Sequence, residues 1–130
     1  MGSMIAPLSE FVIRPGSSRL RVFIRIYRTR TEMLKAMRED VVGGIANSTL
    51  ACTVHLTKSL MHEPNVGSVV FFSKLHCTRD IVAHELVHVA ANILERRGRK
   101  GLSWEDEKGE EELAGLVESL MREFYKHQLP

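Results

Sequence analysis

The residues best suited to chemistry lie in the stretch His84-Glu85-Leu86-Val87-His88, which has the pattern H-E-x-x-H. On an α-helix, residues four apart lie on the same face, so His84 and His88 direct two imidazoles toward one metal ion. Zinc suits neutral imidazole ligands, and a catalytic zinc site keeps one position for water. Glu85 lies about 100° further round the helix, beside such an ion, where it can take a proton from the bound water.

The segment around this motif, residues 78–98, predicts a buried helix. Thr78 is a suitable N-cap for this helix, and Gly98 is a suitable residue to end it. Apolar residues occupy two sides of the helix, so we expect it to lie between a sheet and another helix. The remaining strip carries the two histidines and Glu85. Polar groups on a buried helix are costly unless something satisfies them, and a metal ion would do so. Paired structural histidines are the alternative.

A catalytic zinc site normally has three protein ligands, so one more is needed. The candidates are three neighbouring glutamates, Glu110, Glu111 and Glu112, in a last helix predicted from residue 103 or 106 to about 126. In an antiparallel helix hairpin, Glu111 and His88 each lie about 12 Å from the connecting loop, which would bring them level.

Other features of this last helix leave the choice of glutamate open. The phase of its apolar stripe favours Glu110, and the helix dipole favours glutamates in a first turn without any metal. Ala114 and Gly115 are small, as required where two helices pack closely.

The rest of the chain predicts a small α+β domain. Residues 19–29 and 49–57 alternate apolar and polar positions, as strands do, and residues 66–73 form a third strand. A helix is expected over 31–42, and residues 4–18 read as an irregular lead. We therefore expect one domain, residues 4–130, with about three strands packed on the H-E-x-x-H helix and the C-terminal helix. Residues 1–3 look like a cloning scar.

The H-E-x-x-H motif followed by Glu111-Glu112-Leu113-Ala114 resembles the H-E-x-x-H…E-x-x-A pattern of small phage and bacterial metallopeptidases. These are minimal zincins of the gluzincin type. The resemblance implies a zincin-like fold and favours Glu111 as the third zinc ligand. It also implies that the strand before the metal helix is an edge strand that pairs with extended peptide substrate. The residues given that role are Val69, Val70, Phe71, Phe72 and Ser73.

Composition narrows the classes of partner. A net charge of +2 is too small to indicate nucleic acid binding. The sequence contains no run of 18 apolar residues, so we expect no membrane span. Cys52 and Cys77 form no C-x-x-C pair, so we expect core thiols in a reducing, cytoplasmic setting. His55 is expected to be a residue of a strand surface rather than a ligand. The expected partner is a peptide or protein substrate.

The sequence thus favours a zinc-dependent hydrolase, a metallopeptidase with Glu85 as general base. Two alternatives are a zincin-fold module that binds peptides or proteins without cutting them, and a protein with a structural zinc site. Glu85 favours the enzyme, because a structural zinc site needs no carboxylate beside its ligands.

Overall fold

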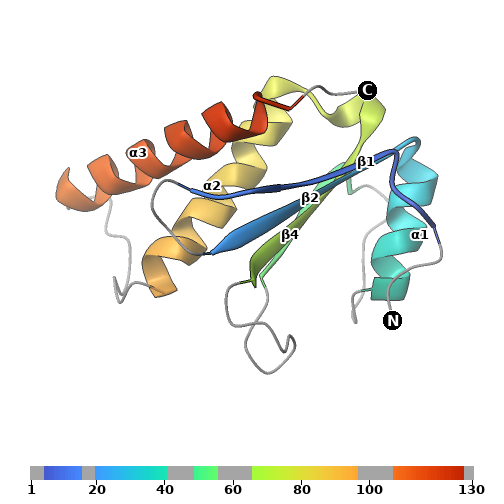
Figure 1. Ribbon diagram of the computed structural model, residues 1–130, viewed down its shortest axis with the longest axis horizontal. Helices are drawn as coiled ribbons and strands as arrows, with labels where there is room; N and C mark the ends of the chain where they lie inside the picture. The colour runs from blue at the N-terminus through green and yellow to red at the C-terminus, as the bar shows by residue number, and fades with distance from the viewer. Residues whose placement is uncertain (1–4, 16–19, 41–48, 56–65, 97–106, 128–130) are drawn as a thin grey trace.

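The computed structural model describes residues 5–15, 20–40, 49–55, 66–96 and 107–127 (Figure 1). Its helices and strands form an α+β fold. In order they are β1 (Ser9–Ile13), β2 (Arg21–Tyr27), α1 (Arg30–Asp40), β3 (Ala51–His55), β4 (Val66–Ser73), the short 3-10 helix η1 (Lys74–His76), α2 (Arg79–Arg96) and α3 (Glu107–Phe124). The predicted fold class is confirmed.

The strands form one mixed sheet in the order β1-β2-β4-β3. β2 and β4 are parallel, whereas β1 pairs antiparallel with β2 and β3 pairs antiparallel with β4. The sheet has four strands rather than the expected three, because residues 9–13 form β1 instead of an irregular lead. Phe11 and Ile13 lie opposite Ile24 and Val22. Pro7 and Pro15 flank this strand without interrupting its hydrogen bonds.

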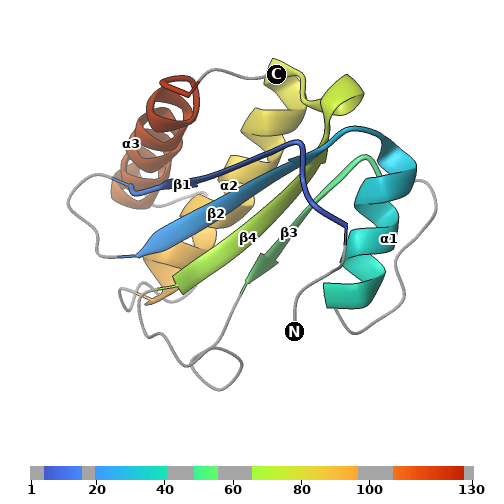
Figure 2. The ribbon, with the colours of Figure 1, turned by 45° about the vertical axis from the view of Figure 1, so that its right-hand side comes forward.

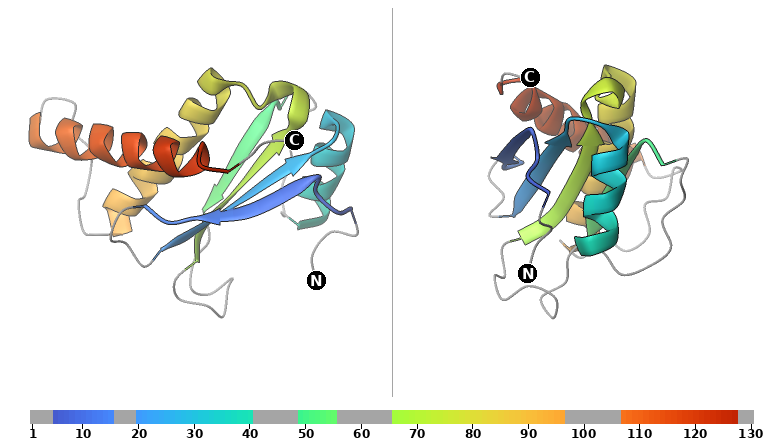
Figure 3. Two further views of the ribbon diagram at one scale, coloured as in Figure 1. Left: turned by 45° about the horizontal axis from the view of Figure 1, so that its top comes forward. Right: turned by 90° about the vertical axis from the view of Figure 1, so that its right-hand side faces the viewer.

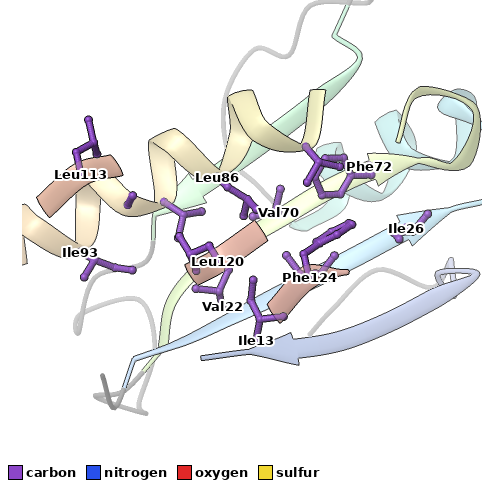
Figure 4. Packing of buried hydrophobic residues seen from close by; sticks show 14 of the residues in the cluster. Ile13, Val22, Ile26, Val70, Phe72, Leu86, Ile93, Leu113, Leu120 and Phe124 are labelled. Carbon is purple, nitrogen blue, oxygen red and sulfur yellow. The ribbon is translucent and has the colours of Figure 1, made fainter. Parts of the chain in front are cut away.

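Helices cover the two faces of the sheet unequally. α1 lies on one face, and α2 and α3 lie side by side on the other (Figures 2 and 3). The larger core fills the space between the sheet and α2 with α3 (Figure 4). Its fully buried side chains include Ile24, Val70, Phe72, Leu86, Ile93, Leu120 and Phe124.

α2 runs back along β4, because η1 reverses the chain at the end of that strand. Near the far end of the helix, Arg96 donates a hydrogen bond to the carbonyl of Gly67 at the start of β4, with Nη2 and O 3.5 Å apart. α3 is antiparallel to α2, since the Arg79 guanidinium at the start of α2 lies 5.0 Å from the centre of the Tyr125 ring beyond the end of α3. The predicted helix hairpin is therefore confirmed.

Candidate active site

Burial fixes how α2 is rotated about its axis. Val82, Leu86 and Val89 are fully buried against the sheet, so the opposite side of the helix faces outward. His84 and His88 lie on that outward side, and the side chain of His84 is 70% exposed. Their ring centres are 5.0 Å apart. The structure thus brings the two imidazoles together at the surface, as the four-residue spacing predicted.

Glu85 behaves differently from its histidine neighbours, because it is buried between α2 and β3. Only 7% of this residue is exposed. Its Oε1 accepts a hydrogen bond from Thr53 Oγ1 of β3 at 2.8 Å. Its Oε2 lies 3.9 Å from Nε2 of His84. One carboxylate oxygen is therefore held by the strand while the other faces the histidine pair.

The side of β3 that faces α2 carries two polar residues which the sequence reasoning did not connect with the site. Thr53 and His55 are two apart, so both point to the same face of the sheet. His55 Nδ1 is hydrogen-bonded to Oγ of the buried Ser68, at 3.0 Å. Burial lowers the pKa of His55, and the nearby His88 and Arg96 lower it further, against the opposing effect of Glu95. His55 therefore lies in the electrostatic neighbourhood of His88. The alternation of side chains along residues 51–55 already places Thr53 and His55 on one face of the strand.

The three candidate third ligands lie on α3 and form no metal-binding group with the histidines among the described residues. Glu110 and Glu111 are exposed, whereas Glu112 is partly buried and the next residue, Leu113, is buried. At 100° per residue, Glu111 lies about 160° from Leu113, on the solvent side of the helix. Within the described ranges, no three His, Cys, Asp or Glu side chains form a group that could hold a metal ion.

The expectation of a close helix contact at two small residues of α3 is wrong. Ala114 and Gly115 were expected at a close contact between helices, yet both are exposed. A Cβ atom added to Gly115 would have no neighbour within 4 Å. α3 instead packs through its large apolar residues, of which Leu113, Leu120 and Phe124 are buried. Nothing at these two small residues requires a close approach to α2.

The strand expected to dock substrate is not an edge strand. β4 is hydrogen-bonded to β2 on one side and to β3 on the other. This pairing covers Val69, Val70, Phe71 and Phe72 on both sides, and Ser73 pairs with Tyr27. The expectation that these five residues add a substrate strand is therefore wrong, because their backbone groups are already used within the sheet. The strand that forms the edge beside α2 is β3.

Both cysteines are free and partly buried. Burial raises the pKa of the Cys77 thiol to about 11. Burial also raises the pKa of Cys52, and the carboxylate of Glu85 adds to that increase. A thiol ligand or nucleophile acts as the thiolate, so a raised pKa disfavours both roles. This agrees with the expectation that the cysteines are core residues.

Comparison with protein-family models, with curated proteins and with solved structures gives no match. In the part of the chain that the structure describes, no helix is long and apolar enough to cross a membrane.

Cys77 should react slowly with a disulfide reagent in the native protein. At pH 8, a pKa of about 11 leaves about 100-fold less thiolate than the ordinary value, and the thiolate is the reactive form. The measurement compares native and guanidinium-unfolded protein in the Cys52→Ser variant, so that only Cys77 reports. Equal rates in the two states would contradict the buried position of Cys77.

Proposed function

We propose that this chain is a zinc-dependent hydrolase that cleaves peptide bonds. The observation that carries the proposal is the placement of Glu85, whose carboxylate is buried and held by Thr53 beside an exposed pair of histidines. Burying a carboxylate is costly, and α2 could have satisfied its packing with an apolar residue at this position. A carboxylate beside two outward imidazoles is an arrangement that metal-assisted hydrolysis can use.

The donor set of α2 fits part of a zinc site. His84 and His88 are exposed, and neither ring is hydrogen-bonded to another side chain among the described residues, so their nitrogens are available to a metal. Two imidazoles suit zinc, and Glu111 remains the proposed third ligand on the strength of the resemblance. When bound, zinc would polarise the scissile carbonyl and make water a better nucleophile.

Glu85 has the role of general base and later of general acid in this proposal. It takes a proton from the attacking water and returns that proton to the leaving amine as the peptide bond breaks. Its Oε2 faces the histidines, and its other oxygen is held by a neutral hydroxyl donor. The hydroxyl thus holds one carboxylate oxygen and leaves the other toward the histidines.

The proposed docking strand for an extended substrate is β3, in place of β4. Among the described residues, β3 is the last strand of the sheet, so one side of its backbone is not used by β4. Peptides add to such edges through main-chain hydrogen bonds. A segment paired along Ala51–His55 would pass beside Thr53, which contacts Glu85. Docking on β3 therefore brings a peptide close to the proposed base.

Purified protein should bind about one zinc ion per chain, because a three-ligand site holds a single ion. His84→Gln and His88→Gln should each abolish most of this binding, measured by metal analysis after reconstitution. Chelation should lower the melting temperature of the parent, since a ligand that binds only the folded state stabilises it. His76→Gln is the matched control, because that imidazole is bonded to Ser73 outside the α2 pair.

The same measurement tests the third ligand. Glu111→Gln should weaken zinc binding far more than Glu110→Gln or Glu112→Gln, since a neutral carboxamide is a poor zinc ligand. Small and equal effects would place the third donor elsewhere. Full zinc binding by both histidine variants would refute the proposed metal site.

Glu85→Gln should keep its zinc and its fold while losing hydrolysis by roughly 10²–10⁴-fold or more, because base and acid are lost together. The substrate is unknown, so parent and variant are incubated with a denatured proteome and new N-termini are counted. Termini made equally by both proteins would exclude Glu85 as the base. Termini made by neither would favour the zincin-fold module that binds peptides without cutting them.

A further inference from the structure

The contact between Thr53 and Glu85 joins two elements with different tasks. Glu85 belongs to α2, which carries the histidines, and Thr53 belongs to the edge strand β3. Thr53 Oγ1 lies 2.8 Å from Glu85 Oε1 and 3.3 Å from the main-chain carbonyl oxygen of the same residue. A hydroxyl has one proton to donate, so the shorter contact to the charged oxygen is the stronger bond.

This bond restricts the orientation of the carboxylate. Glu85 reaches β3 through a flexible side chain, and burial alone would allow its carboxyl group to turn about the last bond. With Oε1 held by Thr53, Oε2 is directed to the side of His84, at 3.9 Å from Nε2. A base must lie within hydrogen-bond reach of the proton that it removes, and a displacement of 1 Å can cost about 100-fold in rate.

We propose that Thr53 is the positioning residue for Glu85, and that the edge strand which docks the peptide also aligns the base. The proposal rests on the proposed function. Thr53 lies in the middle of β3, between Cys52 and Val54, and its side chain faces α2. β3 would then contact both the docked peptide and the carboxylate of Glu85, so this strand would fix the distance between them.

A purely structural role for Thr53 makes a different prediction. In that case the hydroxyl only satisfies a buried carboxylate, and its loss lowers stability without moving Oε2. The chain offers a matched control in Thr78, whose Oγ1 donates to Asp80 Oδ1 at 2.6 Å at the exposed start of α2. Thr78→Val removes the same kind of contact at a place remote from Glu85.

The variants are Thr53→Val, which keeps the shape and removes the hydroxyl, and Thr53→Ser, which keeps the hydroxyl. In the assay of new N-termini, Thr53→Val should bind zinc like the parent and lose about 10–100-fold in rate. Thr53→Ser should recover most of the rate, and Thr78→Val should retain the parent rate. A Thr53→Val protein with full rate, or a Thr53→Ser protein as slow as Thr53→Val, would overturn the proposal.

Crystal structures of the zinc-free variants give a second readout that needs no activity. In Thr53→Val the Glu85 carboxylate should turn away from His84, whereas in Thr53→Ser it should stay in place. An unchanged carboxylate in Thr53→Val overturns the positioning role even if no hydrolysis is ever detected. If the parent shows no hydrolysis but the carboxylate is displaced in Thr53→Val, the proposed function is rejected and the positioning role stands. If Thr53→Val does not fold, Thr53→Ala replaces it in both experiments.

Discussion

The packing of α2 on the sheet is the constraint on which the rest of this molecule depends. Val82, Leu86, Val89, Ile93 and Leu94 are each at most 1% exposed. Fully burying one such side chain stabilises a protein by about 1.5–3 kcal/mol, so the stripe as a whole contributes on the order of 10 kcal/mol. A contribution of this size outweighs any single polar contact. The apolar stripe therefore sets the rotation of α2, and that rotation turns His84 and His88 outward and Glu85 toward β3.

The position of Glu85 follows from this rotation and carries a cost. A buried polar group without a hydrogen bond costs about 1–3 kcal/mol, and a carboxylate costs more. Thr53 offsets part of that cost with a bond of 2.8 Å. The edge strand is thus the partner that makes a buried acid tolerable on α2. The same strand presents His55, whose ring is hydrogen-bonded to Ser68 and whose pKa is lowered in part by His88. The orientation of Glu85 on α2 therefore depends on the position of Thr53 in β3.

Local periodicity predicted the elements that bury an apolar face, and failed where pairing between distant segments decides the outcome. The spacing of His84, Glu85 and His88 sufficed to place them on one helix, because helical geometry is local. β1 was missed, since a five-residue strand between prolines gains its stability from β2 rather than from its own pattern. The edge position expected for β4 came from the resemblance to zincins, and strand order cannot be read from the periodicity of a single strand. The register of β3 against β4 places Thr53 opposite Glu85, and this register cannot be read from the sequence of β3 alone. The phase of the apolar stripe favours Glu110 as the inward glutamate, yet Glu110 and Glu111 are both exposed, because the buried positions of this turn are Gly109 and Leu113.

The proposed site is a metal-binding histidine pair on α2 with Glu85 beside it, and a crystal structure of zinc-loaded protein would test it. Anomalous scattering at the zinc edge locates the ion without reference to any assumed ligand. We expect one ion bonded to an imidazole nitrogen of His84 and of His88 at about 2.0–2.1 Å, with Glu85 outside its coordination shell. An ion bound elsewhere on the chain, or one coordinated directly by Glu85 in place of a histidine, would contradict the account.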